Sequence, residues 1–234
     1  MSPIQQRAIN CSEKIFYKFR QSGKQVEEQS CTLLKDKYPD LNWTTGIFTS
    51  NNYRRAHIDI IDATESHKLW IMHTVILPHL NDPSPIFGFD IICGPTRISG
   101  GFHDFSFGGA DDHFMMAWFD ERVTGLNWKK ERTLPEWAQK IFSPAMVAVG
   151  AITDLDEADQ FLNVGLENLA YYLSKVGGTA DTEIARFYEV IEAQKNYCIN
   201  QRKNPHTPRT MTMLGMSEED AKYFLDEVLF PIAE

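Results

Sequence analysis

The chain has 234 residues, of which 43% are hydrophobic and 24% charged, and this composition is typical of a soluble globular protein. The formal net charge of −9 and the pI near 5.3 argue against general nucleic-acid binding, which needs a basic surface. The apolar runs stay near ten residues, against the roughly 20 of a membrane helix, and the N-terminus is polar. We therefore expect one domain spanning 1–234, no membrane segment and a cytoplasmic location.

The elements change in character along the chain. Apolar residues at helical spacing predict one or two helices over 4–34, closed by Pro39. Short runs rich in β-forming residues follow, at 43–50, 53–62, 68–77, 86–94 and 96–107. Their connections are too short for βαβ crossovers, so they predict an antiparallel meander.

The second half of the chain is mostly helical in pattern. We expect helices at 112–123, 135–142, 154–176, 179–202 and 217–230, with Ser217 as an N-cap, and one further strand at 145–152. The run KLWIMHTVIL at 68–77 is apolar on both faces, so its sheet needs cover on both sides. The sequence therefore predicts an α/β protein, a three-layer α/β/α sandwich around a mostly antiparallel sheet.

Polar residues interrupt three of these strands. His57 and Asp59 lie two apart in AHIDI and so share a face, His73 lies in IMHTV, and Asp90 lies in the apolar run IFGFDIICG, where we expect it to be buried. A turn centred near Glu65 would place His57 opposite His73. A symmetric loop at 78–85 would place His73 opposite Asp90, which predicts a row of His57, His73 and Asp90 with Asp59 beside it.

Two histidines and two carboxylates in apolar surroundings have coupled pKa values, because burial favours a protonated Asp and a neighbouring histidinium favours a carboxylate. Such a group can hold or release a proton near neutral pH. The alternative is a buried structural ion pair between His73 and Asp90. Four such groups on one face favour a functional site.

Other classes of site have weaker support. His103, Asp104 and His113 could be imagined as metal ligands, but they match no strong zinc spacing, and we expect no metal. The four cysteines lie far apart, with no C-x-x-C pair, which favours reduced cytosolic thiols. No Walker A loop, G-x-G-x-x-G or G-x-S-x-G motif occurs, which disfavours nucleotide-binding and serine-hydrolase chemistry.

The stretches AHIDI, IMHTVILP, PIFGFDIICGP, YCINQRKNPHTPR and FLDEVLFPI resemble the ferredoxin-dependent bilin reductases, most closely the phycocyanobilin:ferredoxin oxidoreductase branch. The similarity runs from about residue 50 to the end of the chain. It implies one bilin reductase domain with an α/β/α sandwich fold. It also implies a monomer without a bound metal or flavin that binds biliverdin IXα between the sheet and the C-terminal helices and reduces it with electrons from ferredoxin.

The resemblance also implies roles for individual residues. Asp90 would be the proton donor to the bilin, His73 its hydrogen-bonded partner, and His57 and Asp59 further members of the proton network. Polar and basic residues should hold the bilin propionates and receive acidic ferredoxin. For substrate binding we expect Arg54, Arg97, Asn204 and Arg209; Arg55, Arg202 and Lys203 are further basic residues for propionates or ferredoxin.

Two departures from that branch bear on the product. Asp59 stands where the branch has a Glu associated with reduction of the D-ring vinyl group, and Pro205 stands where it has a second Asp. We therefore expect a four-electron reduction through 15,16-dihydrobiliverdin to phycoerythrobilin. The alternatives are phycocyanobilin formation, a bilin-binding protein without turnover or, outside the family, a metal-dependent enzyme.

Overall fold

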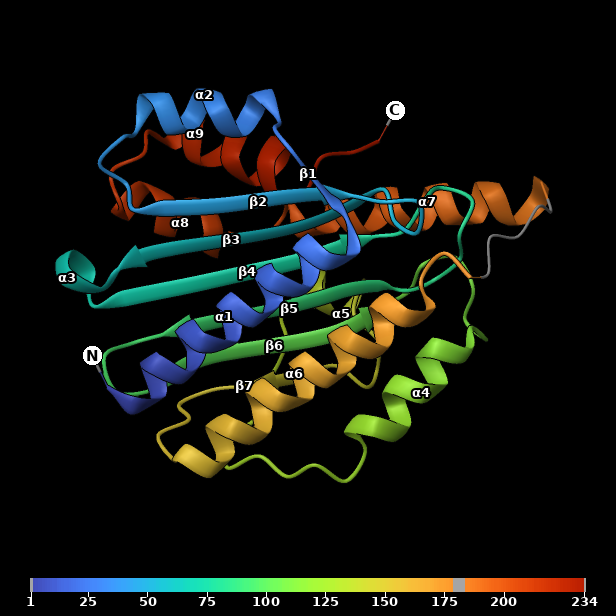
Figure 1. Cartoon of the computed structure of the whole chain (residues 1–234), viewed down its shortest axis with the longest axis horizontal. Coiled ribbons are helices and arrows are strands. Elements are labelled where there is room, and N and C mark those ends of the chain that lie inside the picture. The colour runs from blue at the N-terminus through green and yellow to red at the C-terminus, as the bar shows by residue number, and fades with distance from the viewer. Residues whose placement is uncertain (1, 179–183, 234) are drawn as a thin grey trace.

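One antiparallel sheet runs through the centre of the protein, and its strands follow one another in space in the order in which they occur in the chain. The computed structural model describes residues 2–178 and 184–233, and within these the sheet has seven strands (Figure 1). They are β1 Lys24–Val26, β2 Trp43–Thr49, β3 Arg55–Ala63, β4 Leu69–Leu77, β5 Ile86–Cys93, β6 Ile98–Ser106 and β7 Val147–Val149.

Three amphipathic helices cover one face of the sheet (Figure 1). They are α1 Pro3–Ser22, α4 Phe114–Val123 and α6 Leu155–Lys175. Ser2 and Asp154 cap α1 and α6 by accepting hydrogen bonds from the backbone N–H groups of Gln5 and Glu157. The helices bury an aromatic core against the strands, in which Phe89 of β5 packs on Phe161 of α6.

A second apolar core lies on the opposite face, beneath α2 near the N-terminus, α5 in the middle of the chain and the C-terminal helices. These are α2 Gln29–Lys37, α5 Glu136–Gln139, α7 Ile184–Gln201, α8 His206–Met213 and α9 Glu218–Tyr223, which continues into a π-helical turn, η1 Phe224–Leu229. Ser217 caps α9 by accepting from the backbone of Asp220, as predicted. Each face of the sheet is thus buried, and the predicted three-layer α/β sandwich is confirmed.

The differences from the sequence prediction are local. The region 4–34 divides into α1 and α2, because Gly23 ends α1 in extended backbone and β1 follows it. Neither α8 nor the short α3 Thr64–His67 was predicted. Of the helix expected at 179–202, residues 179–183 lie outside the described residues. Among the residues that the structure describes, no helix is both long and apolar enough to cross a membrane.

Strand register confirms one predicted pairing and corrects the other. The β4–β5 ladder pairs Met72 with Ile91 and Val75 with Gly88, the register that places His73 beside Asp90. The β3–β4 ladder, however, pairs His73 with Asp59 and not with His57. The cause is the turn, because α3 and the left-handed Lys68 (φ 57°) move its centre one residue along the chain. A shift of two in the pairing keeps every side chain on its face.

Candidate active site

A row of polar side chains crosses one face of the sheet. Thr45, Asp59 and His73 follow one another through the pairings of β2, β3 and β4, and His73 Nδ1 lies 2.8 Å from Asp90 Oδ1 on β5. The predicted row therefore exists, but Asp59 lies in it and His57 lies beside it. All four predicted residues are brought together.

His57 and Asp59 form the buried end of the row. His57 Nε2 lies 2.8 Å from Asp59 Oδ2 and 2.9 Å from Thr45 Oγ1, and Trp43 Nε1 donates to Asp59 Oδ1 at 2.7 Å. Burial lowers the pKa of His57, against the pull of Asp59. Burial opposes ionisation of Asp59 as well, but His57 and the bond from Trp43 outweigh it and hold the pKa of Asp59 below its usual value.

His73 and Asp90 form the open end of the row. The side chain of Asp90 is 38% exposed, so the expected burial of Asp90 is wrong. The apolar neighbours Phe89 and Ile91 point to the opposite face and leave Asp90 facing a cavity. Burial would lower the pKa of His73, but the carboxylate of Asp90 and its hydrogen bond outweigh that effect and raise it. A histidine that favours its proton therefore lies beside an accessible carboxyl.

The cavity has a volume of about 700 Å³ and lies between this sheet face and the C-terminal helices. Asp59, His73 and Asp90 form polar points on its floor, and most of its other lining is apolar. Its volume falls in the range of sites that bury a ligand of several rings. His73 Nε2 is buried and, among the described residues, has no hydrogen-bond partner, so it is available to a polar atom of a bound ligand.

The wall next to His73 is held by arginines. Phe230 packs edge-on against the His73 ring, with 5.3 Å between ring centroids. Arg202 donates to the carbonyls of Phe230 (3.1 Å) and Asp226 (2.7 Å), and the buried Arg55 donates to Val228 O at 2.8 Å. Both arginines therefore fix the end of η1 over the site, and neither lines the cavity.

The expected substrate-binding residues are scattered. Asn204 lines the cavity. Arg54 is bonded to Gln194 away from it (2.9 Å), and Arg97, in the turn between β5 and β6, and Arg209, on α8, are exposed and outside its lining. Apart from Asn204, the expected set does not converge on the cavity.

Sequence reasoning missed Arg132, the one Arg or Lys in the described lining of the cavity. Its guanidinium lies over the ring of Phe102, 5.4 Å from the centroid, and donates to Ser99 O at 3.3 Å. Phe102 pairs with Asp90 in the β5–β6 ladder, so the cation lies on the same face as the polar row. Arg132 belongs to an irregular segment between α4 and α5, where no periodicity marks a residue as inward-facing.

The residues weighed as metal ligands do not converge. His103 points away from the cavity, where Nδ1 donates to Gly88 O (2.7 Å) and Nε2 meets Asn168 (2.9 Å). Burial lowers the pKa of His103 to about 4, which keeps the ring neutral. Asp104, the next residue of β6, points to the face opposite to that of His103, which is the face of the polar row. It accepts hydrogen bonds from Ser106 and Ser143. His113 caps α4.

Comparisons with known proteins agree on one family. The profile of the family described as ferredoxin-dependent bilin reductase matches residues 16–231. Phycocyanobilin:ferredoxin oxidoreductase from Trichodesmium erythraeum is 27% identical over 78% of this chain and 74% of its own, and the Gloeobacter violaceus enzyme of that name is 25% identical over 80% and 73%.

Solved structures of similar proteins agree with the sequence comparisons. A protein titled PcyX superposes with a TM-score of 0.70 at 27% identity, covering 97% of this chain and 99% of its own. The tomato phytochromobilin synthase in complex with biliverdin has a TM-score of 0.72 at 13% identity, covering 93% and 82%, and so shares the fold.

Proposed function

The chain belongs to the ferredoxin-dependent bilin reductase family and is an oxidoreductase, and from this premise we propose that it reduces biliverdin IXα to phycoerythrobilin. Ferredoxin is the electron donor of the family. The proposed reaction takes four electrons, delivered one at a time through bilin radicals, and four protons. It reduces the C15–C16 bridge first and the A-ring diene system second.

The observation that carries the proposal is the polar row at the floor of the cavity. Asp90 presents an accessible carboxyl to the cavity, and His73 holds that carboxyl at 2.8 Å. A reduction by single electrons needs a proton at a chosen carbon after electron transfer, and a positioned carboxylic acid supplies it. In this proposal Asp90 is the donor, and His73 fixes its orientation and offers Nε2 to a polar atom of the bilin.

Arg132 is our proposed anchor for a bilin propionate. It is the cation among the described lining residues, and Asn204 and Thr207 lie in the same lining. A guanidinium binds a carboxylate through two parallel hydrogen bonds, which would fix the orientation of the bilin as well as add affinity. The expected roles of Arg54, Arg97 and Arg209 in holding the substrate find no support in their positions.

The state of Asp59 supports a product that keeps the D-ring vinyl group. One of its oxygens accepts from Trp43 and the other faces His57, so both are turned toward protein groups. Its lowered pKa favours the carboxylate, which has no proton to donate. A longer Glu at this position would extend its carboxyl by one methylene toward the cavity, and this difference is the reason to propose phycoerythrobilin over phycocyanobilin.

The test is an anaerobic incubation of the protein with biliverdin, ferredoxin and a ferredoxin reductase, followed by absorbance spectra and chromatography against authentic bilins. We expect 15,16-dihydrobiliverdin to appear first and phycoerythrobilin to accumulate. Phycocyanobilin as the product would refute the proposed specificity. Tight biliverdin binding without any reduction would instead identify a bilin-binding protein.

A further inference from the structure

A second carboxyl lies close to Asp90 on the same face of the sheet. In the β5–β6 ladder Asp90 pairs with Phe102 and Gly88 pairs with Asp104. Alternate residues share a face, so Asp90 and Asp104 are diagonal neighbours, which places them roughly 7–8 Å apart. Asp104 is 1% exposed and outside the lining of the bilin cavity. The mechanism proposed above gives it no task.

Tyr197 of α7 lies over the gap between these carboxyls. Gly88 has no side chain, and the Tyr197 hydroxyl lies 3.7 Å from the point where a Cβ would be. Gln201 Nε2 donates a hydrogen bond to the Tyr197 hydroxyl oxygen at 3.0 Å, so the O–H of Tyr197 is left to donate to another group. Burial and the negative charges of Asp90 and Asp104 raise the pKa of Tyr197, so it remains a neutral hydroxyl that can accept one proton while releasing another.

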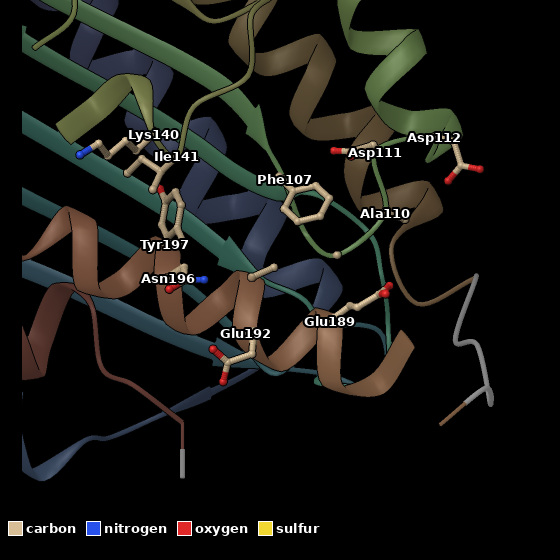
Figure 2. A pocket seen from close by; sticks show the side chains of 12 residues that line it. Phe107, Ala110, Asp111, Asp112, Lys140, Ile141, Glu189, Glu192, Asn196 and Tyr197 are labelled. Atoms are coloured by element: carbon tan, nitrogen blue, oxygen red, sulfur yellow. The ribbon is translucent and has the colours of Figure 1, made fainter. Parts of the chain in front are cut away.

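Asp104 is connected to the protein surface through a serine. Ser143 donates to Asp104 through both its hydroxyl and its backbone N–H, the latter at 3.0 Å, and Ser143 is half-buried. A second cavity of about 610 Å³ reaches Tyr197 and Ile141 from outside the bilin cavity, between α7, the segment after α5 and the segment after β6. Figure 2 shows Tyr197 beside Ile141 there, with Glu189 and Glu192 along α7.

We propose that Asp104 and Tyr197 form an internal relay that returns protons to Asp90 between successive reduction steps. The inference rests on the proposed function. When the two carboxyls reach hydrogen-bond contact with the Tyr197 hydroxyl during turnover, Asp104 gives its proton to the Tyr197 oxygen while the Tyr197 O–H proton passes to the Asp90 carboxylate. Asp104 then regains a proton from solvent through the Ser143 hydroxyl. One proton enters for each proton that Asp90 delivers, and no group in the relay is oxidised or reduced.

The position of Asp90 in the cavity is the reason to propose such a route. The exposed part of Asp90 faces the cavity, so a bound bilin covers the side on which Asp90 meets solvent. Four protons must nevertheless reach the substrate. The relay approaches Asp90 along the sheet from the Gly88 side, and Gly88, Asp104 and Tyr197 all lie outside the lining of the cavity.

The protonation of Asp104 suits this task. Burial raises the pKa of Asp104 to about 6, against the lowering effect of its bonds from Ser106 and Ser143. The other polar groups facing it are the Tyr197 hydroxyl and, across Gly88, Asp90. Its carboxyl can therefore take up and release a proton close to neutral pH, as a relay group must.

The experiment compares Asp104→Asn and Tyr197→Phe with the wild type in single turnovers. Anaerobic enzyme–biliverdin complex is mixed with an excess of reduced ferredoxin, and absorbance resolves the successive bilin species. The hydrogen-bonded pair of His73 and Asp90 holds one proton before electron transfer begins, so we expect the first protonation at the wild-type rate in both variants. Later phases should slow roughly tenfold or more, with a larger solvent deuterium isotope effect.

Two matched controls separate a relay from packing. Asp82→Asn alters another 1% exposed Asp that binds a nearby serine hydroxyl (2.8 Å) and a distant backbone N–H, that of Gly177 (2.8 Å). Tyr172→Phe removes another buried hydroxyl, bonded to Pro85 O at 2.7 Å beneath the opposite face. Both controls should leave all phases unchanged. Biliverdin affinity, measured by absorbance titration, should be unchanged in all four variants.

The pH profile adds a readout that packing alone would not move. In the wild type the later phases should slow as pH rises above about 6, and Asp104→Asn should lose that inflection. Infrared difference spectra of the free enzyme should show a protonated carboxyl that titrates in this range and is absent from Asp104→Asn. Wild-type rates in every phase of both relay variants would overturn the relay and leave the function standing. Failure of the wild type to reduce biliverdin would overturn both.

Discussion

Asp90 combines a fixed orientation with access to the cavity, and this combination predicts what its loss would do. Asp90→Asn keeps the shape of the side chain but cannot donate a proton as an acid. We expect biliverdin to bind with unchanged affinity while product formation falls by at least about 100-fold, as for loss of a general acid. Stopped-flow absorbance checks this. Asp62→Asn, on β3 but facing away from the row, is the control, and undiminished product formation by Asp90→Asn would exclude the donor role.

Arg132 should contribute to affinity more than to chemistry. A hydrogen bond to a charged group contributes about 1.5–3 kcal/mol, so Arg132→Ala should weaken biliverdin binding roughly 10- to 100-fold. Absorbance titration of biliverdin measures the change. Arg97→Ala removes an exposed arginine outside the cavity and should leave the affinity unchanged. Equal affinities for the two variants would show that the propionates bind elsewhere.

His103 makes the stability of the protein depend on pH. Its folded pKa of about 4 lies below the 6.5 that is usual for an exposed histidine, so its contribution is complete above pH 6.5 and is lost as pH falls toward 4. The shift corresponds to about 3 kcal/mol at full protonation. We expect the difference in unfolding free energy between wild type and His103→Gln to shrink by up to that amount from pH 7 to pH 4. Urea titrations measure it, and a difference independent of pH would contradict a neutral buried ring.

The residue-level prediction from sequence succeeded where alternation decides it. Placing His57 and Asp59 on one face requires only a strand, and the symmetric loop at 78–85 gave the correct pairing of His73 with Asp90. The prediction of the β3–β4 pairing was wrong because α3 and Lys68 shift the centre of the turn by one residue. A prediction that places the turn at the midpoint of the loop cannot include this shift. The exposure of Asp90 was also out of reach, since it depends on helices more than 100 residues away in the chain.

At the level of elements, η1 is the feature on which the cavity wall depends. Arg202 donates to the carbonyl of Asp226 within η1 and to that of Phe230 directly after it, so Arg202→Ala should cost about 1–3 kcal/mol of stability. It should also weaken biliverdin binding, because Phe230 would no longer be held against His73. Urea unfolding and absorbance titration test both effects. Lys203→Ala, the exposed neighbour, is the control, and wild-type affinity in Arg202→Ala would show that Phe230 needs no such support.

The prediction of elements was best where composition and turns agree. The strands from β2 to β6 follow from β-rich runs between turn-forming residues, and α6 and α9 follow from acidic first turns and polar N-caps. The π-helical turn carries no sequence signal of its own, because it continues α9 with the same apolar spacing. The short β1, α3 and α8 depend on tertiary contacts more than on local pattern.

At the scale of the whole molecule, the two cores share a single sheet. Trp43 belongs to the core on the cavity side, and Trp118 packs with the core on the other side. Loss of either core exposes a face of the same strands, so we expect one cooperative transition. The fluorescence signal of each tryptophan is obtained by subtracting the urea unfolding curve of the variant that lacks it, Trp43→Phe or Trp118→Phe, from that of the wild type. The two signals should give coincident unfolding midpoints. Separate midpoints would show that the two sides unfold independently.

The sequential order of the strands has a consequence for inheritance. The four titratable residues of the polar row and its flank, His57, Asp59, His73 and Asp90, lie within 55–93, together with both turns that set their register. The cavity roof comes from other parts of the chain. A single recombination event could therefore transfer these four residues together between relatives while leaving the roof of the cavity in place. Proteins of this fold can in this way change the residues that supply protons independently of the residues that bind the substrate.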